Sequence, residues 1–452
     1  MPQIAEAFPG SEALLAPDAL TVSGDGTLAS YFAVTDLAAA SVGTAGLQLS
    51  AFAAPDGHDP APVDVDRRLA GLWFGVSIDP ITWSLPPVWD SIAGDYPTAD
   101  GWIRLHTNAP HHRRAAQSVL GPYEDRDAMA PAVAGWQADD LETAVVEAGG
   151  CAAAMRSMAD WQAHANGAAV AAEPLVAWQA FPDTDPPVID PHPEAPLTGL
   201  RILDLTRVLA GPVAGRFLAA FGADVLRIDP PDWEEPAVVP DVTLGKRCAG
   251  LDLKSPEDRA VFDGLLQGAD VLLHGYRPGA LPALGLDAEG LRAVNPDLID
   301  VSLDAFGWSG PWAGRRGFDS LVQMSTGIAE HGMRQSGADR PFPLPVQALD
   351  HATGYLMAAA VMHALNRRRK TGAVLSAKLS LARTAHLLVG TAADTASDGM
   401  PARSEDDLDP RIEHTAWGPA RRVRFPLSIP GVDVDWRYPA GNLRTVKAVW
   451  RS

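Results

Sequence analysis

The chain contains 452 residues, of which 47% are hydrophobic and 20% are charged. These proportions are typical of a globular protein, and the length allows two or three domains. The formal net charge of −20 argues against nucleic acid as a partner, because nucleic-acid binding needs a basic face. A local basic pocket can still hold an anionic ligand on an acidic protein.

The two cysteines, Cys151 and Cys248, lie far apart and no Cys-x-x-Cys occurs, so neither a disulfide framework nor a zinc site is expected. The sequence shows no apolar run of the roughly 18 residues that a membrane span needs, and residues 1–20 lack a basic leader. We therefore expect no metal, no membrane segment and a cytoplasmic protein.

The first part of the chain predicts helices and a small mixed module. Asp36 precedes an Ala-rich apolar run and is predicted as a helix N-cap, and Val63–Val65 is a short strand candidate. From about residue 93 the pattern changes to α+β, with a turn and strand at 100–106 followed by helices at 111–120, 126–135 and 139–148 and a strand at 151–156. We expect a partial helical segment over 1–92, a small α+β domain over 93–180 and a Pro-rich linker over 181–196.

The second part predicts a parallel sheet. Leu200–Leu205 is a short apolar strand, Pro212 suits the first turn of a helix that runs to Phe221, and Val225–Ile228 is a second strand. Further strand and helix patterns follow, with strands at 249–253, 270–274 and 298–303 and helices at 256–268, 318–328 and 351–366. This is typical of an α/β protein with a Rossmann-like, mostly parallel sheet over 197–390, followed by a tail over 391–452. The Gly-x-Gly-x-x-Gly fingerprint of dinucleotide folds is missing.

Two aspartates open similar Ala-rich helices. Asp36 and Asp350 are each followed, at the same spacing, by a strand that begins at Val63 or Ala377. The repetition indicates either a duplicated piece or a chance match between Ala-rich helices.

A series of motifs in the second half carries a family resemblance. They are Leu-Thr-Gly-Leu-Arg-Ile-Leu-Asp-Leu-Thr…Ala-Gly-Pro, Gly-Ala-Asp-Val-Leu-Arg-Ile-Asp-Pro-Pro, Gly-Lys-Arg…Leu-Asp-Leu-Lys, Ala-Asp-Val-Leu-Leu-His-Gly-Tyr-Arg-Pro-Gly, Phe-Gly…Gly-Pro-Trp and Ala-Leu-Asp-His-Ala-Thr-Gly, in this order across 197–354. The chain thereby resembles the class III CoA-transferases, the family of formyl-CoA transferase, carnitine CoA-transferase and α-methylacyl-CoA racemase. Residues 100–176 resemble that family's small domain. Here this domain precedes the start of the core, which indicates a rearranged or partly duplicated order.

The resemblance implies a CoA-transferase that moves CoA from an acyl-CoA donor to a small carboxylic acid. The reaction would pass through an aspartyl-CoA thioester, and Asp350 matches the position of the nucleophile. The residues alone would favour a helix N-cap for Asp350. The resemblance further implies coenzyme A or acyl-CoA as a substrate rather than a permanent cofactor, and a homodimer.

The resemblance also implies a set of CoA-binding positions. They are Val208, Leu209, Ala210, Arg227, Leu251, Lys254, Gly275, Tyr276 and Arg316. Arginine and lysine suit the phosphates of CoA, although each such residue alone is more often a solvated surface charge. Leu209 and Ala283 stand where the family often has polar or basic residues, which leaves open a catalytically inactive acyl-CoA-binding relative.

A racemase is the less favoured alternative. Moving an α-proton needs two bases on opposite faces, and Phe318 stands where racemases of this family carry a histidine. His331 and His351 lie nearby in sequence, but a lone histidine is usually structural. The sequence therefore favours transfer over racemisation.

Overall fold

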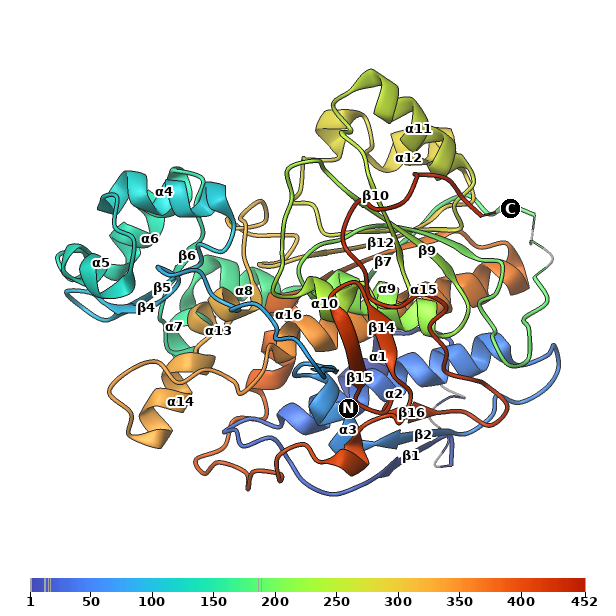
Figure 1. The fold of residues 1–452 in the computed structure, drawn as a ribbon, viewed down its shortest axis with the longest axis horizontal. Coiled ribbons are helices and arrows are strands. Elements are labelled where there is room, and N and C mark those ends of the chain that lie inside the picture. Colours follow the sequence, from blue (N-terminus) through green and yellow to red (C-terminus); the bar gives the residue numbers. More distant parts are fainter. Residues whose placement is uncertain are drawn as a thin grey trace.

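The computed structural model describes residues 2–11, 14, 16, 18–185, 187 and 189–451. A large α/β body carries a smaller lobe that projects to one side (Figure 1). The expected fold class, a Rossmann-like parallel sheet with a smaller α+β part, is confirmed. No helix among these residues combines the length and the apolar character needed to cross a bilayer.

The main sheet has seven strands in the order β10-β9-β8-β11-β12-β13-β7. The first six are parallel, and β7 pairs antiparallel at the edge. Their bounds are β7 Ala177–Ala180, β8 Arg201–Leu205, β9 Asp224–Asp229, β10 Arg247–Gly250, β11 Val271–His274, β12 Ile299–Asp304 and β13 Leu375–Ser380. The strands predicted at 200–205, 225–228, 270–274 and 298–303 are thus confirmed, whereas the one predicted at 249–253 begins two residues earlier. The chain builds the sheet outward from β8 in one direction and from β11 in the other, so β8 and β11 flank a topological switch point.

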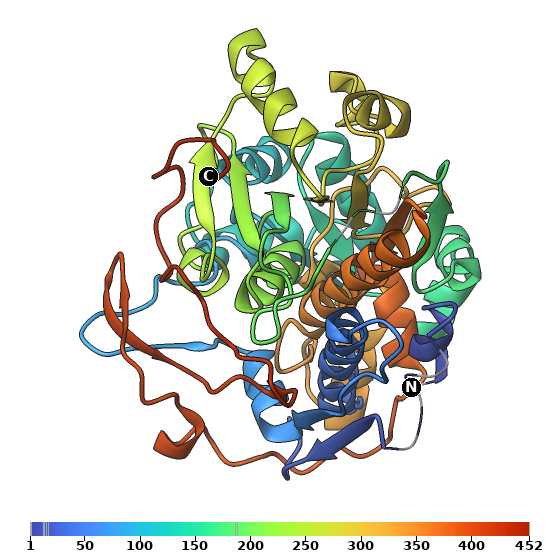
Figure 2. The ribbon, with the colours of Figure 1, turned by 90° about the vertical axis from the view of Figure 1, so that its right-hand side faces the viewer.

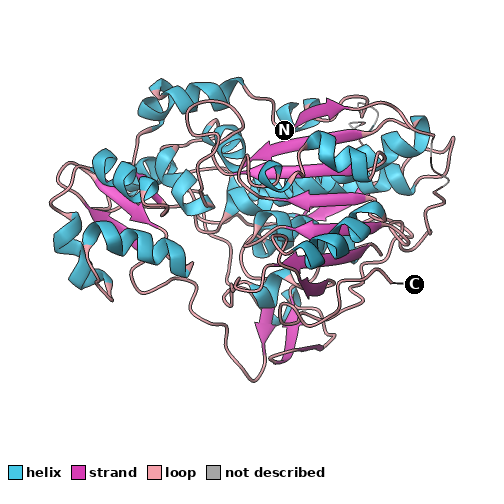
Figure 3. Ribbon diagram, turned by 90° about the horizontal axis from the view of Figure 1, so that it is seen from above, coloured by secondary structure: helices cyan, strands magenta, loops and turns pink. Residues whose placement is uncertain are grey.

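Helices cover both faces of this sheet (Figure 3). Alternate residues of β8 separate into two cores, with Ile202 in one and Leu203 in the other, as expected for a strand buried on both faces. The first core holds α2 Val34–Ala53, α9 Ala210–Ala220, α15 Ala348–Thr371 and α16 Leu381–Val389; the second holds α11 Pro256–Gln267 and α12 Ala288–Val294. Helix α9 begins two residues before Pro212, which was predicted at its first position.

The smaller lobe has a hydrophobic core of its own. Its three-stranded sheet, in the order β4-β5-β6, packs against three helices around Ile103, Met129 and Leu141. The bounds are β4 Gly94–Pro97, β5 Trp102–Leu105, α4 Pro110–Leu120, α5 Arg126–Val133, α6 Ala138–Glu147 and β6 Ala152–Ala154. The three predicted helices are confirmed, and the strand predicted at 151–156 is shorter. Two short helices, α7 Met158–Ala163 and α8 Ala165–Ala172, lead back to the main sheet.

The beginning and the end of the chain share two sheets. Strand β2 (Val63–Asp66) pairs with β1 (Leu20–Ser23) and β16 (Leu427–Ser428), and β3 (Ile78–Pro80) pairs with β15 (Gly418–Arg422), next to β14 (Glu413–Thr415). The bounds of the remaining helices are α1 Pro2–Glu6, α3 Arg67–Trp73, α10 Val239–Val242, α13 Asp319–Ser325 and α14 Ile328–Ser336. Residues 391–452, predicted as a separate tail, therefore complete sheets that residues 20–80 begin.

The prediction of Asp36 as a helix N-cap is wrong. The N-cap of α2 is Ala33, and Asp36 lies in the first turn, where its carboxylate pairs with Arg67. Helices α2 and α15, which carry the two similar aspartates, lie side by side (Figure 2). The helix predicted over 318–328 is also divided, into α13 and α14, at Gly327 with a φ of +85°.

A buried ion pair joins two of the sequence motifs. The ammonium of Lys246 lies 2.8 Å from Asp204 Oδ2 and 2.9 Å from the carbonyl oxygen of Pro212, and both charged side chains are fully buried. The other oxygen of Asp204 accepts the backbone N–H and the hydroxyl of Thr206. The pair thereby fixes the end of β8, the first turn of α9 and the Gly-Lys-Arg segment together.

We expect Lys246→Met to lower the free energy of unfolding by about 3–5 kcal/mol, because it leaves the Asp204 carboxylate buried without its counter-charge. The control is Asp263→Ala, which removes a partly exposed helical pair with Arg259 and should cost no more than about 0.5 kcal/mol. Urea denaturation of both variants measures the difference. Similar losses in the two variants would show that the buried Lys246–Asp204 pair stabilises the fold no more than the partly exposed pair does.

Candidate active site

A strained turn connects β8 to α9. Val208 has a φ of +64°, which is unfavourable for a β-branched residue. Its N–H donates to Glu235 Oε2 at 2.8 Å. Two residues into α9, a Cβ at Gly211 would lie 2.3 Å from Thr206 Cβ, so only glycine allows the helix to begin this close to the strand. The first N–H groups of α9 therefore open at the carboxyl end of the sheet, where they favour negative charge.

Asp350 lies in the first turn of α15, beside the start of α9. The cap residue of α15 is Gln347, so the N-cap interpretation of Asp350 is wrong. One turn later, a Cβ at Gly354 would come within 2.3 Å of the Ala210 carbonyl oxygen. The glycine in the Asp-His-Ala-Thr-Gly motif thus lets the two helices approach closely, which brings Asp350 to the turn of Val208.

Asp350 is 8% exposed, and no residue that the structure describes donates a hydrogen bond to its carboxylate. Its own N–H donates to Asp319 Oδ2 at 2.9 Å. Burial, together with the nearby Asp319 carboxylate, raises the pKa of Asp350 well above its usual value. Burial also raises the pKa of Asp319 to about 6, against the opposing hydrogen bond from Gln323. A carboxylate that is desolvated and unpaired is a stronger nucleophile than one in water.

Asp350 opens onto a cavity of about 500 Å³ at the switch point between β8 and β11. The structure brings seven of the predicted site residues to this cavity: Val208, Leu209, Ala210, Gly275, Tyr276, Arg316 and Asp350. Ligands of open α/β sheets bind at this position, outside the carboxyl ends of the strands. The cavity therefore unites residues from three separate motifs with Arg316.

Several basic residues that line this cavity were not identified from the sequence. Arg207, Arg277 and Arg315 also line it. The Arg207 guanidinium lies between Trp233 and Tyr276, and it donates to the Tyr276 hydroxyl at 2.8 Å. Their positions directly after the ends of β8 and β11 are the signal that could have identified Arg207 and Arg277.

Three predicted CoA-binding residues lie outside the cavity. Arg227 is fully buried, and its guanidinium is engaged by Asp229 at 2.9 Å and by Glu235. Leu251 packs in the second core, and Lys254 is exposed and lines none of the described cavities. Arg227 instead acts on the site indirectly, because the Glu235 that it orients holds the N–H of Val208.

The small lobe adds two histidines that the sequence did not single out. His106 and His112 both pack on Phe318, His106 with ring centroids 3.7 Å apart and parallel rings. Burial lowers the pKa of each to about 3, so both are neutral. His331 instead bonds to the Ala393 carbonyl, and His351 stacks on Phe74, and neither lines the cavity.

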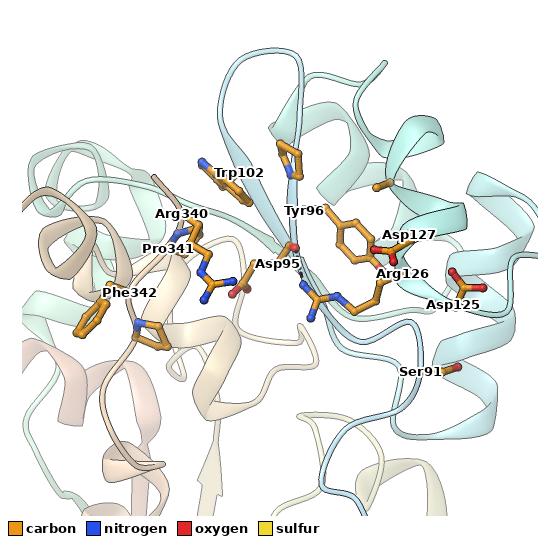
Figure 4. A pocket seen from close by; sticks show the side chains of 13 residues that line it. Ser91, Asp95, Tyr96, Trp102, Asp125, Arg126, Asp127, Arg340, Pro341 and Phe342 are labelled. Atoms are coloured by element: carbon orange, nitrogen blue, oxygen red, sulfur yellow. Dashed lines mark hydrogen bonds between the residues drawn. The ribbon is translucent and has the colours of Figure 1, made fainter. Parts of the chain in front are cut away.

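A larger hollow of about 900 Å³ lies elsewhere, between the small lobe and the 340–343 segment (Figure 4). Its charged side chains are Arg126 and Arg340 together with three aspartates, and Asp95 is already paired with Arg104. None of the predicted site residues lines it. Size alone therefore does not locate the candidate chemistry, and the smaller cavity at Asp350 is the better candidate.

The comparison with protein families agrees with this position. The model of CoA-transferase family III matches residues 197–419, which include β8, the turn of Val208 and Asp350. This part of the chain matches CoA-transferase family III, so the resemblance seen in the motifs is confirmed.

Curated relatives match over part of their length. A probable fatty acyl-CoA transferase of Mycobacterium tuberculosis is 33% identical over 195 residues, covering 40% of this chain and 49% of that protein. A succinate–glutarate CoA-transferase of Agrobacterium fabrum is 34% identical over 201 residues, covering 40% of this chain and 50% of the relative. A crystal structure of an M. tuberculosis protein with 33% identity covers 44% of this chain and 58% of its own, with a TM-score of 0.38. The chain spans about half the length of the curated relatives it matches.

The raised pKa values of Asp319 and Asp350 predict a pH-dependent cost in stability. A carboxyl whose pKa is higher in the folded than in the unfolded protein stabilises the fold below its usual pKa of 3.8, and this contribution is lost as the pH rises through the folded value. We therefore expect Asp350→Asn to be more stable than the parent at about pH 8, with the difference shrinking toward about pH 4.

Urea denaturation over this pH range tests the expectation. The control Asp263→Asn changes a partly exposed carboxylate and should shift stability by less than about 0.5 kcal/mol at every pH. An Asp350→Asn variant that is less stable than the parent at about pH 8 would contradict the burial argument.

Proposed function

We propose that this protein is a CoA-transferase that moves CoA from an acyl-CoA donor to a carboxylic acid through a thioester on Asp350. The observation that carries the proposal is the Asp350 carboxylate. It is buried and unpaired, and it lines the cavity at the carboxyl ends of the strands. Relatives of the same family named as succinate–glutarate and acetyl-CoA:oxalate CoA-transferases support the reaction class.

The proposed first half-reaction exchanges one acyl bond for another. An Asp350 oxygen attacks the thioester carbonyl, the C–O bond forms as the C–S bond breaks, and a mixed anhydride and CoA thiolate result. The thiolate then attacks the Asp350 carbonyl carbon, which releases the donor acid as its carboxylate and leaves CoA bound to Asp350. The acceptor carboxylate reverses these two steps with its own acyl group. Each step replaces one activated acyl group by another, so no external energy source is needed.

The rim of the cavity is suited to the charged part of CoA. Arg207, Arg277 and Arg316 line it, and the uncapped start of α9 adds backbone N–H groups. Guanidinium groups bind phosphate oxygens through charge-assisted hydrogen bonds. The net charge of −20 therefore does not oppose an anionic substrate at this place.

A non-catalytic acyl-CoA-binding protein is the second candidate. Leu209 lines the cavity at a position that is often polar in the family, and the chain spans only part of its relatives. The intact Asp350 favours transfer. A homodimer is implied by the resemblance and is part of the proposal, to be tested by analytical ultracentrifugation.

The decisive test is mass spectrometry of the protein after incubation with a panel of acyl-CoAs. We expect a CoA adduct on the peptide that contains Asp350, which hydroxylamine removes. Asp350→Ala should abolish the adduct and lower CoA transfer by on the order of 10³-fold or more. Asp36→Asn is the matched control, because it alters the similar aspartate of the neighbouring helix α2. CoA binding without adduct or exchange for any donor would instead support the second candidate.

A second prediction separates two basic residues that the sequence treated alike. Arg316 lines the cavity and Lys254 does not, although both are exposed. We expect Arg316→Gln to raise the dissociation constant for CoA by about tenfold and to weaken its salt dependence. Lys254→Gln should leave binding within about twofold of the parent. Isothermal titration calorimetry measures both, and the reverse order would place the phosphates of CoA away from this cavity.

A further inference from the structure

A second cavity meets the first at Asp350. It has a volume of about 280 Å³ and shares Val208, Leu209, Trp233, Glu234, Phe318 and Asp350 with the larger one. It extends from Asp350 toward the small lobe, where it is closed by the segments 87–90 and 106–109. A group bonded to Asp350 therefore has a compartment on each side, and the arginines line only the first.

Most of this second lining is apolar. It consists of Pro87, Val88, Trp89, Ala109, Val208, Leu209, Trp233, Pro236, Ala237, Val238 and Phe318. His106 adds a ring that is neutral, because burial lowers its pKa to about 3, and that stacks on Phe318. At roughly 30 Å³ for each water-sized group, the cavity has room for about nine non-hydrogen atoms.

The charged groups of the lining are all carboxylates, and no lysine or arginine is present among the described residues that form it. Asp90 is already held by Arg113 at 2.6 Å and by the Thr107 hydroxyl at 2.7 Å. Glu235 is held by Arg227, and Glu234 by Arg444. A second carboxylate on a substrate would find like charges here, because the lining also holds Asp319, which accepts from Gln323 and from the N–H of Asp350.

A nearby cation, Arg104, is already paired with a carboxylate outside the cavity. The guanidinium of Arg104 lies 4.6 Å from the centroid of the Trp89 ring and pairs with Asp95 at 2.7 Å. Two uncharged polar groups do lack partners: the Ser320 hydroxyl and His106 Nδ1 are buried without a hydrogen bond to any described residue. Buried polar atoms of this kind require a ligand atom or a water molecule, and a single carbonyl oxygen meets this need without adding charge.

We propose that this cavity holds the acyl group of an apolar monocarboxylic acid, of up to about nine non-hydrogen atoms, with its carbonyl at Asp350 and Ser320. The negative charges of the lining oppose a dicarboxylic acyl group, and its apolar walls match an uncharged chain. The proposal rests on the transferase function, and it adds the class of acid that the enzyme activates.

The test compares two acyl-CoAs of the same shape. Glutaryl-CoA and 5-methylhexanoyl-CoA differ only in the end group, a carboxylate against an isopropyl group. We expect the apolar compound to form the Asp350 adduct at least about tenfold faster. Binding of the same two compounds to Asp350→Asn, measured by calorimetry, gives the preference of the cavity without turnover and should show the same order.

A charge introduced into the lining should change this preference. Val88 is 52% exposed and lines the cavity, so Val88→Arg can add a guanidinium with little loss of packing. We expect it to raise the glutaryl-CoA rate relative to its apolar counterpart by about tenfold. Val449→Arg is the matched control, because Val449 is 54% exposed and lines neither cavity.

The possible outcomes distinguish the transferase function from the apolar specificity of the second cavity. Equal or faster acylation by glutaryl-CoA, or by an acyl-CoA that ends in a trimethylammonium group, overturns the apolar specificity while the transferase function stands. If no donor forms an adduct but Asp350→Asn still binds the apolar compound more tightly, the transferase function fails and the specificity of the cavity survives. Absence of both adduct and preference overturns both.

Discussion

The site depends on one buried pair of opposite charges. Lys246 and Asp204 have no access to solvent, and each makes a further bond to the backbone or side chains of the β8–α9 turn. A buried ammonium without its partner would be costly, so the pair can form only when β8, β10 and the first turn of α9 are in register. The β8–α9 turn then places Val208 and the N–H groups of α9 at the cavity. A second set of charges, Arg227 with Glu235, holds the same turn from the other side.

Asp350 stands at a boundary between two electrostatic environments. Toward the carboxyl ends of β8 and β11 it faces arginines and helix N–H groups, and toward the small lobe it faces aromatic rings and neutral histidine. Burial and the neighbouring Asp319 carboxylate outweigh these basic groups, none of which bonds to Asp350, and they keep the pKa of Asp350 raised. The same desolvation that weakens the fold at neutral pH is what makes the group reactive. The two cavities therefore explain both why ionised Asp350 lowers the stability of the fold and how it is proposed to act as a nucleophile.

Local patterns were enough to predict much of the sheet. Short apolar runs such as Leu200–Leu205 are buried on both faces, so their strand character follows from composition alone. Asp350 and Val208 were named as site residues from one family pattern, and both line the same cavity. Burial was not predictable: Arg227 has the sequence context of a surface cation, yet Asp229 and Glu235 enclose it. His106 and His112 contact Phe318, which lies more than 200 residues away in the sequence. No local sequence pattern indicates such a contact. Asp36 was misplaced because pairing with Arg67 cannot be distinguished from capping in the sequence alone.

The shared sheets at the two ends of the chain have a consequence for biosynthesis. Strand β2 ends at Asp66, but one of its two neighbouring strands is β16, at Leu427–Ser428. Strand β3 pairs with β15, at Gly418–Arg422. During translation these early strands have unpaired edges until nearly the whole chain has left the ribosome. Pairings between such distant segments form late, and exposed edges attract other chains in the meantime. The parallel sheet and the small lobe, in contrast, draw all their strands from residues 94–380, which are synthesised before β15 and β16.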